Sequence, residues 1–247
     1  MNTSADFSDK QMAIIQQVRL SLKKCADQKT IDSTKRFFKE GETAQVYGVK
    51  MADVRKIAKD LFKQLKKLPK QEVLLLCDEL WKSKYLEEAV VACVWSESLH
   101  KLYEPPDFNI FQHWVDNYID NWAACDTLCN QTIGIFIMMY PEFLAGLKKW
   151  ATSSNRWMKR ASAVSLIVPA RKGLFLEDIF EIADTLLCDP DHMVQKGYGW
   201  MLKVASQTHE KEVFDYVVSK KAVMPRTALR YAIEKMPSTL RAAAMEK

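Results

Sequence analysis

Glycine and proline are scarce in this chain, and their scarcity limits the folds that it can adopt. Of its 247 residues, 7 are Gly and 8 are Pro. A β-sandwich or a β-barrel needs many tight turns, which these two residue types dominate. The composition therefore argues against a turn-rich β fold. Hydrophobic residues still make up 48% of the chain, enough for one large domain or two small ones.

The sequence also lacks the apolar segments that secretion or membrane insertion requires. Its first ten residues are polar and contain no apolar core of a signal peptide. The longest apolar run, Ile133 to Tyr140, is far shorter than the roughly 20 residues of a membrane span. We therefore expect no membrane partner and a cytoplasmic location, which in a bacterium is the cytosol or nucleoid.

Paired cysteine motifs are absent too. None of the six cysteines forms a Cys-x-x-Cys pair, so free thiols in a reducing compartment are expected. Cys125 and Cys129, with His113 upstream, match no common zinc spacing. Buried thiols on a helix explain the two cysteines better, and we expect neither a metal nor a cofactor.

Net charge is small, at +5 with a pI near 8.7. By itself this is weak evidence for an anionic partner, and the position of the charges matters more. Five lysines share the outer face of the helix expected over residues 52–68, where a solvated surface is the ordinary explanation: Lys56, Lys59, Lys63, Lys66 and Lys67.

Apolar residues recur at helical spacing along most of the chain, for example Ile14, Val18 and Leu22. Proline falls between the periodic segments, where it disrupts no helix interior, and Pro105-Pro106 is the clearest break. The spacing predicts helices over residues 12–26, 34–39, 52–68, 71–81, 85–103, 107–119, 122–140, 142–150, 156–168, 176–188, 192–206, 210–219, 226–235 and 239–245.

Helix starts that resemble one another recur about every 35 residues, which is near the period of stacked helix-pair repeats. They occur near Leu86, Trp122, Trp157, Val194 and Arg226. The sequence therefore predicts an all-α fold, an α-solenoid of HEAT-like repeats in one domain over residues 1–247, with 1–10 as a flexible N-terminus. In such a fold one helix of every pair lines a concave surface.

Trp122 and Asp126 are four residues apart, so on a helix they point the same way. Further along the chain come Arg160 and Trp200, each near the start of a predicted helix. We expect these four side chains to share the concave surface. The same helices would also place Lys159, Lys196, Lys203, Arg226 and Arg230 there.

This mixture of cations and indoles favours nucleic acid, because Lys and Arg neutralise phosphates while indoles pack on sugars or bases. A carboxylate repels phosphate, so Asp126 fits only if it stabilises positive charge on the substrate. The alternative is a structural Asp126 that pairs with a nearby arginine. Near the N-terminus, Phe37 is flanked by basic residues and is either a core residue or a further nucleic-acid contact.

Three motifs, in order, resemble those of the AlkD-type DNA alkylation-repair glycosylases, a family built from HEAT-like repeats. The family's Trp-x-x-x-Asp element is similar to Trp122–Asp126. Its Trp-x-x-Arg-Ala helix start is similar to residues 157–161, which contain Arg160. Its Gln-Lys-x-x-Gly-Trp stretch is similar to residues 195–200, which end at Trp200. The resemblance runs from about Lys35 to the last helices.

The resemblance implies an enzyme that cleaves the N-glycosidic bond of N3- or N7-alkylated purines in duplex DNA, without a base-flipping pocket. Asp126 would stabilise the oxocarbenium-like sugar or act on water, Trp122 and Trp200 would pack on the lesioned nucleotide, and Arg160 would hold phosphate. A monomer is the simplest state. The remaining expected DNA contacts are Lys159, Lys196, Lys203, Arg226, Arg230 and Phe37.

Two positions depart from the family pattern. Phe37 stands where the family presents a phenol, so a hydroxyl contact is lost there. A basic residue of the third inner helix falls on Val168, for which Arg171 is the nearest substitute. A helical scaffold that binds DNA or protein without catalysis remains the alternative, because fold alone does not specify function.

Overall fold

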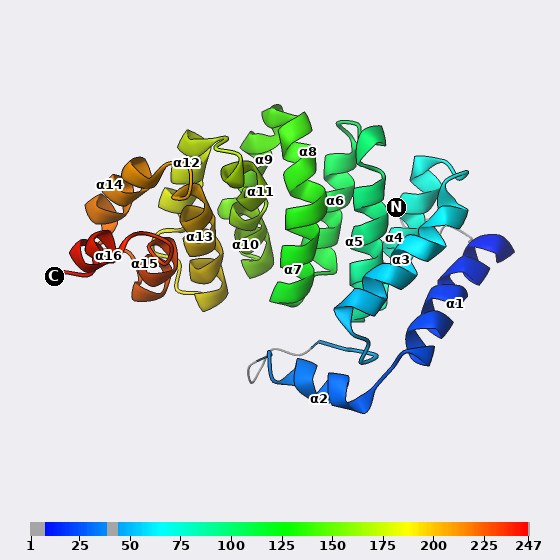
Figure 1. The fold of residues 1–247 in the computed structure, drawn as a ribbon. Helices are drawn as coiled ribbons and strands as arrows, with labels where there is room; N and C mark the ends of the chain where they lie inside the picture. Colours follow the sequence, from blue (N-terminus) through cyan, green and yellow to red (C-terminus); the bar gives the residue numbers. More distant parts are fainter. Residues whose placement is uncertain (1–7, 39–43, 247) are drawn as a thin grey trace. The chain divides into compact units, whose positions relative to one another are not determined.

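The computed structural model describes residues 8–38 and 44–246. Across these residues the secondary structure is helical, and no strand is present beyond one isolated parallel bridge between Gln45 and Tyr85 (Figure 1). The all-α prediction is therefore confirmed. Within the same residues no helix has the length and hydropathy that crossing a bilayer demands.

The chain divides into two compact units, residues 1–103 and 104–247. The division falls just before Pro105-Pro106, the break seen in the sequence. The single domain expected over 1–247 stays a prediction. Of the expected flexible N-terminus, residues 1–7 lie outside the described residues, while Asp9 and Lys10 already belong to the first helix.

The first unit consists of helices that pack around a central buried one. The longest apolar run of the unit forms this central helix, in which nearly every residue is buried, and it contacts three others. The elements are α1 (Asp9–Lys24), α2 (Gln28–Lys35), α3 (Met51–Leu65), α4 (Lys70–Lys82), the central α5 (Leu86–Ser98) and the short η1 (His100–Leu102).

Helix α2 begins earlier than the sequence predicts. The spacing predicts a helix over residues 34–39, but the Asp27 side chain accepts the Thr30 N–H at 3.0 Å and caps the helix there. The predicted end at Lys39 lies outside the described residues. Gly48, with φ of +87°, follows on the chain and lies against α2, where a Cβ would clash with the Ile31 side chain.

Two glutamates are buried in α5, and the sequence did not reveal their purpose. Glu87 accepts the backbone N–H groups of Tyr47, Gly48 and Val49 at 3.0, 2.8 and 3.1 Å. Glu88 accepts the Tyr47 hydroxyl at 2.6 Å and a forked contact from Arg19 at 3.2 Å. Buried carboxylates need such partners, and here they fasten the segment before α3 to the core of the first unit.

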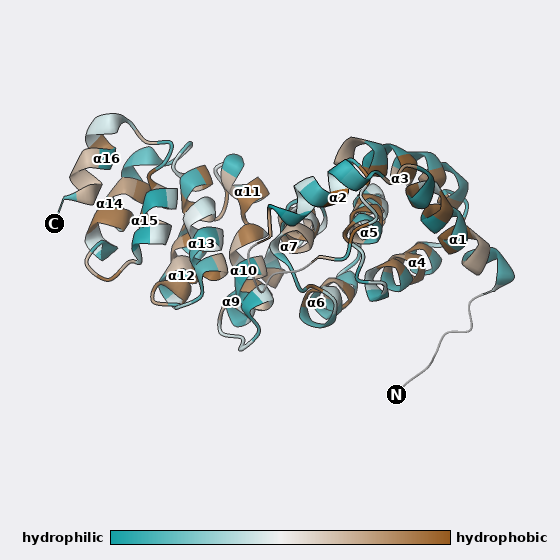
Figure 2. Ribbon diagram, turned by 90° about the horizontal axis from the view of Figure 1, so that it is seen from below, coloured by the Kyte–Doolittle hydropathy of each residue, from teal (hydrophilic) through white to brown (hydrophobic). Residues whose placement is uncertain are grey.

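The second unit is a stack of helix pairs. In one layer α10 contacts α7 and α13, and α13 contacts α15, while in the other α9 contacts α12. Many of these helices carry both polar and apolar residues, as the hydropathy colouring in Figure 2 shows. The elements are α6 (Asp107–Asn117), α7 (Trp122–Leu128), α8 (Gly134–Met139), α9 (Leu144–Ala151), α10 (Arg156–Val164), α11 (Ile167–Arg171), α12 (Leu176–Leu186), α13 (His192–Ala205), α14 (Glu210–Lys220), α15 (Arg226–Ala232) and α16 (Ser238–Met245).

Besides residues 85–103, where α5 ends at Ser98 and η1 follows, two helices that the sequence predicts as continuous are interrupted. Residues 122–140 contain a π-helical turn, Cys129–Ile133, between α7 and α8. Residues 156–168 break at Ser165 and Leu166, after which α11 begins. Pro169 lies in the first turn of α11, where backbone N–H groups have no partner within the helix, so its missing N–H costs no helical hydrogen bond. Apolar periodicity continues through both breaks, which is why spacing alone does not reveal them.

Candidate functional site

The three sequence motifs meet at one buried ion pair. The Arg160 guanidinium donates to Asp126 in a fork, from Nε to Oδ1 at 2.8 Å and from Nη2 to Oδ2 at 2.8 Å. Its Nη1 donates to the carbonyl oxygen of Met193. A forked arginine–carboxylate contact is among the strongest polar contacts in proteins. The Asp126–Arg160 pair therefore ties α7 to α10, and the Met193 bond ties α10 to α13.

Burial governs the electrostatics of this pair. The side chains of Arg160 and Asp126 are 6% and 16% exposed. Burial raises the pKa of the Asp126 carboxyl above its ordinary value, although the charge and hydrogen bonds of Arg160 act in the opposite direction. For Arg160, burial lowers the pKa but the neighbouring Asp126 outweighs it, so the arginine stays charged.

Both tryptophans lie on helices that the pair connects. Trp122 begins α7, one turn before Asp126, and the helix is capped by Asn121, whose Oδ1 accepts the Ala124 N–H at 2.9 Å. Trp200 is on α13, three residues after Gly197. A Cβ on Gly197 would lie 3.2 Å from Cγ of Arg160. Both indoles are half-buried, so each keeps an accessible part.

Several of the predicted DNA-binding cations are already neutralised within the protein. Lys159 lies 2.6 Å from Asp189, a carboxylate whose side chain is only 8% exposed. Lys203 pairs with Glu234 at 3.1 Å and stands over the ring of Tyr231. These two ion pairs link neighbouring repeats, so Lys159 and Lys203 help to hold the repeats together.

Three of the predicted cations have no acidic partner among the described residues: Lys196, Arg226 and Arg230. Lys196 is half-buried on α13, and both arginines are exposed on α15. These three cations can therefore bind a phosphate without breaking an existing ion pair. Phe37 belongs to the first unit, where it is 67% exposed and makes no core contribution.

Sequence reasoning missed the acids that organise this region. Asp189 and Asp191 flank Pro190 before α13, and Asp191 caps that helix and binds Arg156 at 2.9 Å. An Asp before an apolar-periodic segment signals a helix cap, so Asp191 was detectable. Gly197 was detectable as well, because a glycine inside a helix often marks a close approach. The ion partners of Asp189 required the tertiary structure.

The two neighbouring cysteines are buried beneath the pair. Cys125 and Cys129 are fully inaccessible, and burial raises the pKa of the Cys125 thiol. The Cys125 Sγ lies 3.8 Å from the carbonyl oxygen of Trp157. His113 is exposed and contacts Tyr118 and Asn117. Among the described residues no group of three or more His, Cys, Asp or Glu is placed to hold a metal ion.

Comparison with known proteins gives these motifs a context. A solved structure described as a predicted DNA alkylation repair enzyme from Enterococcus faecalis shares the fold, with a TM-score of 0.75 and 15% identity. The match covers 86% of this chain and 97% of that one. No curated protein matches the chain. The family model for DNA alkylation repair enzymes matches residues 18–236, and the chain therefore belongs to the DNA alkylation repair enzyme family.

Proposed function

We propose that this protein is a DNA glycosylase that excises cationic N3- and N7-alkylpurines from duplex DNA and leaves an abasic site, without a base-flipping pocket. The observation that carries the proposal is Asp126, a nearly buried carboxylate that lies one helical turn from a partly accessible indole and is held by the buried Arg160. A binding surface for phosphates gains nothing from a carboxylate, whereas a site for a cationic sugar does.

The reaction is a hydrolysis at the anomeric carbon. Alkylation gives the purine a positive charge, so the base leaves with the electron pair of the glycosidic bond and becomes neutral. Positive charge then develops on the deoxyribose, as in glycoside hydrolysis generally. Water adds to the sugar and gives up a proton. In this proposal Asp126 stabilises the charged sugar and accepts or directs that proton.

Arg160 has a positioning role in this scheme. Its fork fixes both carboxylate oxygens, and its positive charge favours the ionised form of Asp126 against the effect of burial. A fixed carboxylate needs little reorganisation when charge develops on the sugar. The phosphate contact expected of Arg160 stays a prediction, because its guanidinium is occupied by Asp126 and Met193.

The rival function is a scaffold that binds DNA without catalysis. Under that function the Asp126–Arg160 pair would only hold the helices together. A base-release assay separates the two readings. Purified protein is incubated with duplexes that carry N7-methylguanine or N3-methyladenine, and the released base is measured. Release above the spontaneous rate supports the glycosylase, and none above it contradicts the proposal.

Variants at the pair then distinguish catalysis from structure. Asp126→Asn leaves the Arg160 charge buried without its partner, which costs about 3–5 kcal/mol of stability. The double variant Asp126→Asn with Arg160→Gln removes both charges and should recover much of that stability.

If Asp126 is catalytic, both variants should lose roughly 100-fold or more in single-turnover excision at saturating DNA. The loss should be larger for N7-methylguanine than for the more labile N3-methyladenine. Recovery of excision together with stability in the double variant would contradict the catalytic role.

A further inference from the structure

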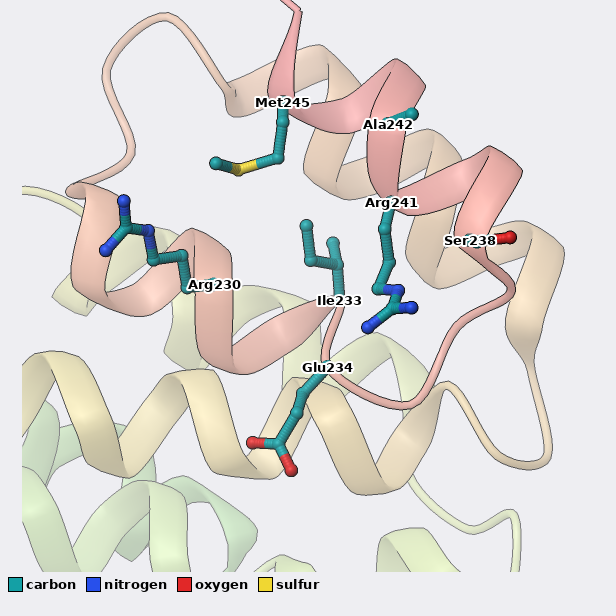
Figure 3. Close-up of a pocket in the computed structure, with 7 residues that line it drawn as sticks. All are labelled: Arg230, Ile233, Glu234, Ser238, Arg241, Ala242 and Met245. Carbon is teal, nitrogen blue, oxygen red and sulfur yellow. The ribbon is translucent and has the colours of Figure 1, made fainter.

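The last helices of the chain flank an open pocket that the proposed reaction does not use. The cavity has a volume of about 420 Å³ and lies between α15 and α16 (Figure 3). We call it the α15–α16 pocket. It is lined by Arg230, Ile233, Glu234, Ser238, Arg241, Ala242 and Met245.

The pocket combines an apolar floor with cations at its edges. Figure 3 shows Ile233 and Met245 projecting into the space between the helices, with Arg230 and Arg241 on either side of Ile233 in this view. Both arginines are exposed, and neither has an acidic partner among the described residues. The one carboxylate of the lining, Glu234, is neutralised by Lys203.

This pocket lies at the end of the helix that carries two of the unpaired cations. Arg226, Arg230 and Ile233 follow at helical spacing, so the unpaired cations of α15 lead along one face of the helix to the pocket. Helix α15 packs closely on α13, which carries Trp200. A Cβ on Gly199 would lie 2.7 Å from Tyr231, so glycine is needed for this approach. The Lys203–Glu234 pair connects the same two helices at the edge of the pocket.

We propose that the α15–α16 pocket binds the sugar–phosphate backbone of the duplex beside the lesion. Arg230 and Arg241 would each hold a phosphate, and the apolar face of a deoxyribose would pack on Met245 and Ala242, beside the buried Ile233. This proposal rests on the proposed function and names a subsite for its substrate. A repeating polyanion explains both the arginines of the pocket and the unpaired cations outside it, Lys196 and Arg226. An acidic peptide bound in the pocket would not explain Lys196 and Arg226.

The test measures binding of an undamaged fluorescent duplex by anisotropy over a series of salt concentrations. The double variant Arg230→Ala with Arg241→Ala is compared with the full-length parent. Lys149→Ala serves as the control, because Lys149 is an exposed lysine of α9 with no acidic partner among the described residues. Each lost phosphate contact reduces the slope of log K against log salt by about 0.9. We therefore expect the slope to fall by about 1.8 in the double variant and to stay unchanged in the control.

Excision separates this proposal from the proposed function. In single-turnover excision of N7-methylguanine, the double variant should need more DNA than the parent to reach half-saturation. If the parent fails to release base, the proposed function fails, whatever the variants do. If the parent binds and excises but the double variant has the parental salt slope and half-saturation, the pocket does not bind DNA. A labelled Glu- and Leu-rich peptide that binds the parent, is lost in the double variant and resists displacement by duplex would also overturn the proposal.

Discussion

At the scale of single residues, the proposed reaction depends on how burial and Arg160 together set the charge of Asp126. Burial favours the neutral acid, while the forked contact from Arg160 favours the anion. Stabilising a charged sugar or accepting a proton from water needs the anion. The proposed reaction is therefore expected to depend on the protonation of Asp126.

This balance predicts the pH dependence of excision. The pKa of Asp126 is raised above its ordinary value, so its carboxylate gains a proton at a higher pH than an exposed aspartate does. Single-turnover excision should therefore decline as pH falls through that raised pKa, at a higher pH than an exposed aspartate would give. The acid limb should be measured at saturating DNA and be absent from the residual activity of Asp126→Asn. An identical limb in that variant would assign the titration to another group.

At the scale of elements, two glycines of α13 determine how closely its neighbours approach. Gly197 makes room for the Arg160 side chain, and Gly199 makes room for the backbone of α15 at Ala228. The first contact involves a flexible side chain, while the second involves main-chain atoms that cannot rotate away. The two positions should therefore respond differently to the same added methyl group.

Gly199→Ala should destabilise the protein by about 1–3 kcal/mol through overpacking, less the ~1 kcal/mol that alanine gains in a helix. Gly197→Ala should cost less, because Arg160 can shift by a few tenths of an ångström. Urea denaturation of both variants measures the difference. A Gly199→Ala variant more stable than Gly197→Ala would show that the α13–α15 contact is looser than the structure indicates.

The loop between α12 and α13 controls one of the predicted DNA contacts. Asp189 neutralises Lys159 through Oδ2 and accepts the Asp191 N–H through Oδ1. Asp189→Asn keeps an oxygen that can accept the Asp191 N–H but removes the negative charge of the carboxylate. Lys159 is then available to a phosphate. The variant should bind undamaged duplex more tightly, with a salt slope steeper by about 0.9. As a control, Asp215→Asn on α14 frees Lys211 instead and should leave the slope unchanged. An equal gain in both variants would indicate a general charge effect.

At the scale of the whole molecule, the net charge of +5 does not show which cations are paired with acids and which are unpaired. Lys159 and Lys203 are committed to Asp189 and Glu234, while Lys196 and Arg226 have no acidic partner in the part of the chain that the structure describes. Only cations that are not already neutralised release counterions from DNA in full.

Replacing Lys196 and Arg226 together by alanine should therefore reduce the salt slope for duplex binding by about 1.8. Replacing Lys159 and Lys203 together should reduce it less and should instead lower the melting temperature, because two inter-helix ion pairs are lost. Anisotropy titrations and thermal unfolding of both double variants provide the comparison. Equal slopes would mean that the ion pairs open when DNA binds.

The sequence by itself determined the helical class and most helix positions. Apolar spacing located α13 and α14 to within a residue at each end, because apolar residues recur at helical spacing through both helices and Asp191 caps α13. It also predicted that Trp122, Asp126, Arg160 and Trp200 share one surface, because their motifs recur at the period of the repeats, and the structure pairs Asp126 with Arg160. It missed the π-helical turn after α7 and the break before α11, because both preserve the apolar pattern.

Only the tertiary structure decided which charges remain available. Arg160 and Arg226 are equivalent in sequence as cations near helix starts, yet Arg160 is buried against Asp126 and Arg226 is exposed. The pairing of Lys159 with Asp189 depends on where the loop between α12 and α13 lies, which no local pattern specifies. An ion pair forms between residues 30 or more positions apart when packing brings helices together, and its strength depends on burial. Charge availability is therefore a property of the packed repeats, while the helices themselves are a property of the chain.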